Sequence, residues 1–279
     1  MTFSIVARSA DGGELGVAVA SKFLAVGAAV PAAASGAGAL ATQAWANLRY
    51  RPKGLALLAA GGDAASVVAE LTAADEGRAD RQLGVVDAAG GSATYTGSGC
   101  FPWAGGRHGQ GYACQGNILT GPEVVAAMEA AWLASDTTAP LAERLLAALA
   151  AGDEAGGDSR GRQSAALLVV SPEGGYGGGT DVAVDLRVDD HPDPVPELAR
   201  LLGIHTLLFG STPEADCLPL SGDLAAEVAA LLAAAGHPGD DVETALAAWA
   251  GVVNLEERLR PGLLDPVVLE HLRTTAGPA

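Results

Sequence analysis

The chain has only three cysteines among its 279 residues, Cys100, Cys114 and Cys217, and no two of them form a CxxC pair. This number and spacing argue against a disulfide framework or a thiol redox motif, and Cys114 fits a small core residue better than a nucleophile. Basic residues are also scarce, with 16 Lys and Arg against 33 Asp and Glu. The formal charge of −17 argues against nucleic acid or an anionic membrane as a partner, because both require a basic face.

Export signals and strongly apolar runs are lacking as well. No basic stretch precedes an apolar segment at the N-terminus, so we expect no secretory signal and a cytoplasmic location. The uncharged stretch 23–48 is mostly alanine and contains Pro31, Gln43 and Asn47, whereas a membrane span needs about 20 strongly apolar residues. Buried strands fit this stretch better. Aromatic residues are only 4% of the chain, so we expect small side chains to fill the core.

Strand-like and helix-like segments alternate in blocks. Hairpins are predicted over residues 2–21, 81–97 and 162–188, and helices over 54–75, 122–133 and 141–151. Asp63 is a candidate N-cap within the first helical block, and the glycine-rich segment 99–121 is too irregular for a regular element. The order favours an α+β fold with two antiparallel sheets and helices outside them, an αββα layering. We place this domain at residues 1–210, a linker rich in Pro, Ser and Gly at 211–222, and a small all-helical, acidic domain at 223–279.

Thr2 is the first candidate for chemistry. The apolar residues Phe3, Ile5 and Val6 follow it at once, so a strand is predicted to begin at residue 2 and to hold the terminus rigidly. Methionine aminopeptidase normally removes Met1 before a residue as small as threonine. The new terminus would carry a hydroxyl and an amine with a pKa of about 8, and this amine could act as the base that activates the hydroxyl. A small second residue is common in cytosolic proteins, so the hairpin is the stronger indication.

Polar residues near strand ends are candidate partners of this nucleophile. Lys22 follows the second strand and, if buried, would lower the pKa of the nucleophile or stabilise an oxyanion; a solvated lysine is the alternative. Gln43 and Asn47, in "ATQAWAN", are candidates for binding a substrate amide or for core hydrogen bonds. In the glycine-rich segment, Asn117 is a candidate oxyanion donor and Trp103 a candidate wall of the binding site.

The stretch "GGDSRGRQSAALLVV" gathers Asp158, Arg160, Arg162 and Gln163 just before a strand that should be buried. Arginines in this setting suit bidentate recognition of a substrate carboxylate, and a structural Asp–Arg pair is an equally good interpretation. The acidic residues of "VDLRVDDHPDP", over 184–194, match no familiar metal-site spacing. We therefore expect neither a metal nor an organic cofactor, although a metal-dependent hydrolase that uses residues 189–193 is a third alternative.

Several segments together resemble the family known as domain of unknown function 1028, which is grouped with the N-terminal nucleophile (Ntn) hydrolases. They are "MTFSIVARSADGGELGVAVASKFLAVG", "ATQAWAN", "RQLGVVDAAG", "PWAGGRHGQGYACQGNIL", "GGDSRGRQSAALLVV" and "VDLRVDDHPDP". The resemblance implies a four-layer αββα sandwich in which Thr2 begins a central strand and is both nucleophile and base. Proteasome-like members have "DSR" after the second strand where this chain has "ASK", so the groups around the amine must differ. The helical tail resembles a small peptidoglycan-binding-like module that some members carry.

Two hypotheses of different classes follow. The first is an Ntn-type amidohydrolase that cleaves a small amide or acyl-amino compound through an ester intermediate on Thr2. Asn117 or backbone N–H groups would hold the oxyanion, and Arg160 or Arg162 would anchor a carboxylate. The second is a catalytically silent binding protein whose helical tail forms a homodimer or binds cell-wall fragments.

Overall fold

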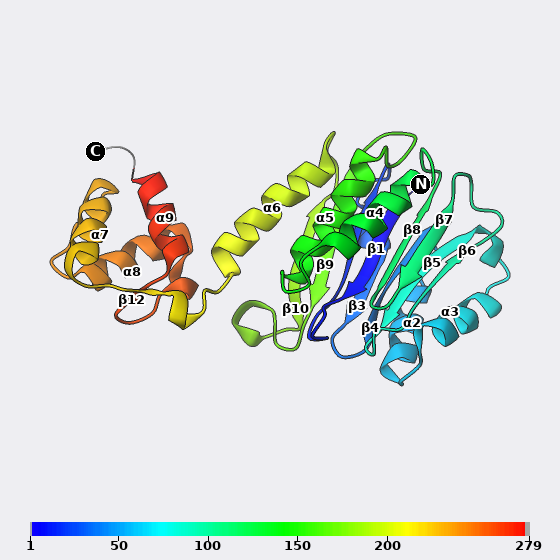
Figure 1. The fold of residues 1–279 in the computed structure, drawn as a ribbon, viewed down its shortest axis with the longest axis horizontal. Helices are drawn as coiled ribbons and strands as arrows, with labels where there is room; N and C mark the ends of the chain where they lie inside the picture. The colour runs from blue at the N-terminus through cyan, green and yellow to red at the C-terminus, as the bar shows by residue number, and fades with distance from the viewer. Residues whose placement is uncertain (1, 277–279) are drawn as a thin grey trace. The chain divides into compact units, whose positions relative to one another are not determined.

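The computed structural model describes residues 2–276 and divides into two compact units, of which the first ends at Leu202 and the second begins at Gly203 (Figure 1). The first unit contains two antiparallel sheets, with strand orders β10-β9-β2-β1-β8-β7 and β3-β4-β5-β6. The strands of the larger sheet are β1 (Thr2–Arg8), β2 (Leu15–Ser21), β7 (Gly105–Gly109), β8 (Tyr112–Asn117), β9 (Ser164–Val170) and β10 (Val182–Val188). Those of the smaller sheet are β3 (Pro31–Ala34), β4 (Gly38–Ala44), β5 (Arg81–Asp87) and β6 (Ser92–Thr96).

Helices cover the outer face of each sheet (Figure 1). The larger sheet packs against α4 (Glu123–Ala134) and α5 (Leu141–Glu154), and the smaller one against α2 (Tyr50–Ala59) and α3 (Ala64–Ala73). Shorter elements are α1 (Val26–Ala29), η1 (Arg78–Asp80) and η2 (Tyr176–Gly178). The inner faces of the two sheets pack on each other through valine and alanine side chains. This mixed α/β arrangement with antiparallel sheets confirms the predicted fold class at that level.

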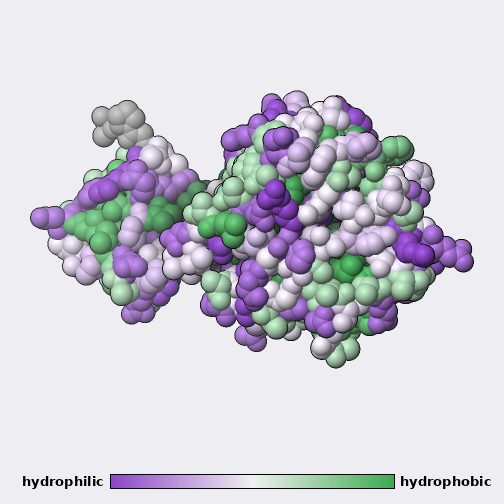
Figure 2. Space-filling view, turned by 45° about the vertical axis from the view of Figure 1, so that its right-hand side comes forward, coloured by the Kyte–Doolittle hydropathy of each residue, from purple (hydrophilic) through white to green (hydrophobic). Residues whose placement is uncertain are grey.

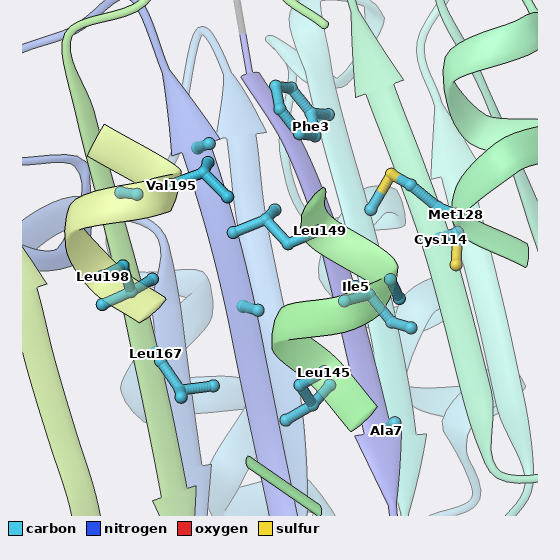
Figure 3. Packing of buried hydrophobic residues seen from close by; sticks show 14 of the residues in the cluster. Phe3, Ile5, Ala7, Cys114, Met128, Leu145, Leu149, Leu167, Val195 and Leu198 are labelled. Carbon is cyan, nitrogen blue, oxygen red and sulfur yellow. The ribbon is translucent and has the colours of Figure 1, made fainter. Parts of the chain in front are cut away.

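Strand β1 is buried on both faces, and its side chains alternate between them. Phe3, Ile5 and Ala7 join the core under α4 and α5, where they lie with Leu145 and Leu149 (Figure 3). The even-numbered positions face the other sheet instead, as the bond from Ser4 Oγ to Gln43 of β4 and the place of Val6 in the core between the sheets show. The polar end of this inner face begins at Thr2.

The glycine-rich segment 99–121 is the main correction to the prediction, because it contains strands β7 and β8 rather than an irregular loop. Glycine lowers strand propensity, but here it permits close packing. A Cβ on Gly116 would lie 2.3 Å from Leu119 Cδ1, and one on Gly106 would lie 3.0 Å from Thr94 Oγ1. The predicted N-cap is confirmed, since the Asp63 side chain accepts a hydrogen bond from Ser66 N.

The second unit is a small helical body with its own core. Its elements are the end of α6 (Pro194–Phe209), η3 (Glu214–Asp216), β11 (Leu218–Pro219), α7 (Gly222–Ala234), α8 (Val242–Val253), η4 (Glu256–Arg258), β12 (Leu263–Leu264) and α9 (Pro266–Thr275). The division falls earlier than the predicted boundary at residue 210, because Leu207 and Leu208 pack on this core and Arg258 bonds to the carbonyls of Thr206 and Leu207. The predicted linker 211–222 includes η3 and β11.

On the face of the first unit shown in Figure 2, hydrophobic residues form small patches among hydrophilic ones. Among residues 2–276, no helix combines the length and the apolar character that crossing a bilayer requires.

Candidate functional site

The antiparallel pairing brings the start of β1 next to the ends of β2 and β8. Thr2 is opposite Asn117 in the register with β8, and the pairing of Phe3 with Ala20 places Ser21 of β2 on its other side. Thr2 is only 5% exposed, and its Oγ1 lies 3.1 Å from Ser21 Oγ. The hydroxyl of Thr2 is therefore held at a fixed place near the end of a central strand.

Four buried amide side chains lie between the two sheets behind Thr2. We call them the amide cluster: Gln43, Gln82, Gln115 and Asn117, none more than 1% exposed. The carbonyl oxygen of Thr2 accepts hydrogen bonds from Gln43 Nε2 at 3.2 Å and from Asn117 Nδ2 at 3.5 Å. The same two nitrogens donate to Gln82 Oε1, at 2.8 and 2.9 Å. The amide cluster thus fixes the main chain of Thr2 from the facing sheet.

Ser4 connects the remaining member of the cluster. Its Oγ donates to Gln43 Oε1 and accepts from Gln115 Nε2, both at 2.7 Å. Within residues 2–276, Gln115 Oε1 is buried and has no hydrogen-bond partner. A buried polar atom without a partner is unfavourable by about 1–3 kcal/mol, so Gln115 Oε1 lowers the stability that the amide cluster contributes.

A cavity of about 550 Å³ opens beside Asn117. Its lining residues come from the last residues of β4 and β8, from η1, and from the loops after β4, β6 and β8 and before β9: Ala44, Trp45, Asp80, Gly99, Cys100, Phe101, Asn117, Ile118 and Arg160. Ala44 and Ile118 have left-handed backbone conformations, with φ of 65° and 51°. This region is disfavoured for residues other than glycine, above all for a β-branched one, and such strain is found most often at functional sites.

Asp158 organises the loop that carries Arg160. Its side chain is 2% exposed, and its carboxylate accepts hydrogen bonds from the backbone nitrogens of Lys22, at 2.8 Å, and Arg160, at 2.9 Å. Arg160 Nη2 lies 3.4 Å from the same carboxylate, and the Arg160 side chain is 47% exposed. Asp158 is therefore a structural residue here, and Arg160 contributes to the cavity wall.

Lys22 does not occupy the buried position that a catalytic role would require. Its side chain is exposed, and its Nζ donates to the carbonyl of Arg162 at 3.1 Å. Lys22 is therefore a solvated lysine at the end of a strand, which is the alternative that the sequence left open.

Other predicted binding residues have partners elsewhere. Arg162 bonds to Asp153 at 2.9 Å and lies 3.4 Å from Asp193, and the first of these carboxylates raises the pKa of its guanidinium. Gln163 donates to Asp190 at 3.1 Å. Neither side chain lines the cavity beside Asn117.

Asn47 and Trp103 also lie outside the lining of that cavity. Asn47 Nδ2 donates to Asp75 Oδ2 at 2.9 Å, and this bond, after the stronger one from Arg81, helps to hold the pKa of Asp75 well below its usual range. Trp103 packs against the core under α4 and α5. Cys114 is fully buried in the same core, and burial raises the pKa of its thiol, as expected for a core residue.

Sequence reasoning missed Ser21, Gln82, Gln115 and the aromatic residue Phe101. Gln82 and Gln115 stand in otherwise apolar or small-residue strands, and such isolated amides were a usable signal. In the part of the chain that the structure describes, no group of three His, Cys, Asp or Glu side chains could hold a metal ion, so residues 189–193 do not form the metal cluster considered as the third alternative.

Comparison with known proteins places this geometry in a family. A crystal structure of a DUF1028 protein from Silicibacter pomeroyi has 33% sequence identity and a TM-score of 0.66, and the match covers 81% of this chain and 92% of that one. The ancestral β-subunit Anbu from Yersinia bercovieri matches with 13% identity and a TM-score of 0.33, over 72% of this chain and 93% of that one, too low a likeness to indicate a shared fold. No curated protein matches the chain. The family model of DUF1028 matches residues 2–198, and the chain therefore belongs to DUF1028, a family of unknown function.

Proposed function

We propose that this protein is an amidohydrolase of the Ntn type, with Thr2 as its nucleophile and a small amide or acyl-amino compound as its substrate. The observation that carries the proposal is the place of Thr2. Its buried hydroxyl lies 3.1 Å from Ser21 Oγ, and its strand partner Asn117 lines the cavity, although Thr2 itself is not a lining residue. The succession of helices, two sheets and helices supports the assignment to the four-layer αββα sandwich that the sequence resemblance implies.

The reaction begins with attack of Thr2 Oγ1 on the amide carbonyl carbon. The hydroxyl proton passes to the α-amine of Thr2 and then to the leaving nitrogen as the C–N bond breaks, which leaves an ester on Thr2. A water molecule hydrolyses this ester, releases the carboxylic acid and regenerates the hydroxyl. The mechanism requires removal of Met1, which lies outside the described residues, because the amine of Thr2 is otherwise part of a peptide bond.

The amide cluster positions the nucleophile rather than the oxyanion. Both hydrogens of Asn117 Nδ2 are accounted for by the carbonyl of Thr2 and by Gln82 Oε1. We therefore assign the oxyanion to backbone N–H groups of the cavity wall, and we assign Gln43 and Asn117 to holding the main chain of Thr2 in place.

The test combines intact mass with activity. We expect protein purified from a bacterial cytosol to lack Met1, and Thr2→Ser to retain measurable hydrolysis in a screen of small amides. Thr2→Ala should lose at least about a thousandfold in rate, since no hydroxyl remains to attack. Thr72→Ala is the matched control, because Thr72 is also buried, at 7% exposure, and lies on α3 away from this site.

Two outcomes reject the proposal. One is retention of Met1 on folded, pure protein. The other is a Thr2→Ala protein that hydrolyses the same amide as fast as the Thr72→Ala protein does. Either result would favour the alternative of a binding protein.

A further inference from the structure

Two large aromatic side chains stand exposed in the wall of the cavity beside Asn117. Trp45 is 77% exposed and Phe101 is 70% exposed, and they come from loops that follow different strands, β4 and β6. Their loops are nonetheless held in place. Trp45 N donates to the carbonyl of Asp80 at 3.1 Å, and the carbonyl of Phe101 accepts from Ile118 N at 2.9 Å. Exposed apolar groups gathered at a cavity are typical of a binding site for a flat apolar group.

The same cavity wall contains one arginine. The guanidinium of Arg160 is about half exposed, while the main chain beside it is fixed by Asp158. Asp80 also lines the cavity, and its neighbour in the chain, Arg81, is paired with Asp75 at 2.9 Å. A carboxylate is a ligand that a guanidinium binds well, through two parallel hydrogen bonds.

We propose that the cavity binds an amide that carries both an aromatic ring and a carboxylate, with the ring against Trp45 and Phe101 and the carboxylate on Arg160. The chemical class is that of N-aroyl and N-arylacetyl amino acids. That such a compound is also cleaved rests on the function proposed above, but its binding does not. The volume of about 550 Å³ is ample for a compound of this size.

Four small compounds separate the two halves of the proposal. They are benzoylglycine, benzoylglycinamide, acetylglycine and acetylglycinamide, which have both the ring and the carboxylate, the ring alone, the carboxylate alone, and neither. Dissociation constants are measured by calorimetry on the Thr2→Ala protein, so that no turnover disturbs the titration. We expect benzoylglycine to bind about tenfold more tightly than benzoylglycinamide and about tenfold more tightly than acetylglycine.

Variants assign each half to its residues. Arg160→Gln should abolish the preference for benzoylglycine over benzoylglycinamide, while Arg187→Gln should leave it unchanged; Arg187 is a comparable control because its side chain is 43% exposed and paired with an aspartate. Trp45→Leu and Phe101→Leu should each reduce the preference for the ring. Tyr176→Leu is their control, since Tyr176 is 70% exposed and lies outside the cavity lining.

Equal affinity for benzoylglycine and acetylglycine would overturn the proposal, and so would equal affinity for benzoylglycine and benzoylglycinamide. An effect of Tyr176→Leu or Arg187→Gln as large as that of the cavity variants would overturn it too. If benzoylglycine binds as expected but the wild-type protein without Met1 hydrolyses none of the four, the ligand class stands and the proposed hydrolase function fails.

Discussion

Two glutamines of the amide cluster provide a matched pair for a stability experiment. Gln82 and Gln115 are both 0% exposed, lie on facing strands and differ in how their oxygens are satisfied. Replacement by methionine keeps the length and most of the volume of either side chain and removes its hydrogen bonds. We predict that Gln82→Met destabilises the first unit by about 3 kcal/mol and Gln115→Met by about 1 kcal/mol or less.

The difference follows from the buried groups that each replacement leaves behind. Gln82 has three buried partners, Gln43 Nε2, Asn117 Nδ2 and the carbonyl of Gly116, and its two other bonds are only partly buried, so water can replace them. At about 1 kcal/mol for each buried group that loses its partner, the sum is about 3 kcal/mol.

Gln115→Met has a compensating effect. Gln115 Nε2 bonds to Ser4 through its Oγ and its carbonyl, so two buried acceptors lose a donor. The same change removes Gln115 Oε1, the buried oxygen that has no partner among the described residues, and this relief offsets about 1 kcal/mol or more. The net cost should therefore be small.

Urea titrations of the two full-length variants and the wild type measure the effect. The slope of the first transition should stay unchanged, so that the midpoints report stability directly. If Gln115→Met destabilised as much as Gln82→Met or more, the hydrogen-bond accounting of the amide cluster would be wrong.

Three further changes test other parts of the chain. Asp75→Asn should lower the free energy of unfolding at pH 7. Hydrogen bonds, chiefly from Arg81, keep the folded-state pKa of Asp75 below its unfolded value, so this deficit relative to the wild type should shrink as pH falls below about 4. Urea titrations at pH 7 and pH 3 measure this deficit, and one that stayed constant would contradict the prediction. Gly84→Ala should destabilise by about 2 kcal/mol or more, since its Cβ would lie 2.0 Å from a buried side-chain oxygen of β8; a thermal midpoint equal to that of the wild type would disprove this clash. Arg258→Met should destabilise the second unit by about 3–5 kcal/mol because it leaves the carboxylate of Asp265, 2.7 Å away and buried, without its counter-charge; calorimetry of the full chain tests this, and an unchanged transition would refute it.

Much of the fold could be predicted because local signals agreed with the final packing. The first hairpin is buried on both faces and mostly apolar, as strands covered by helices and by another sheet should be. Asp63 begins α3 through the side-chain bond expected of an N-cap. Strands β7 and β8 could not be predicted in this way, since their glycines serve contacts with Thr94 and Leu119 that only the tertiary structure reveals.

The site was predictable in part for a similar reason. Thr2 was singled out at the start of a predicted strand and Asn117 as a candidate oxyanion donor in the glycine-rich segment, and the register makes them direct neighbours. The choice between Arg160 and Arg162 depends on the loop between them, where Gly161 adopts a φ of 106°. No pattern of side chains indicates that Arg160 lines the cavity while Arg162 pairs with acidic residues elsewhere.

The backbone of the cavity wall points to a site that is formed before any ligand arrives. Ala44 and Ile118 each hold an unfavourable left-handed conformation, and such a conformation persists only where the surrounding structure imposes it. Ala44 is the last residue of β4 and is followed by Trp45, and Ile118 directly follows β8. Because both residues are held at the ends of paired strands, a ligand has little backbone ordering to offset when it binds. A rigid wall of this kind suits a small substrate with a defined shape better than a flexible partner.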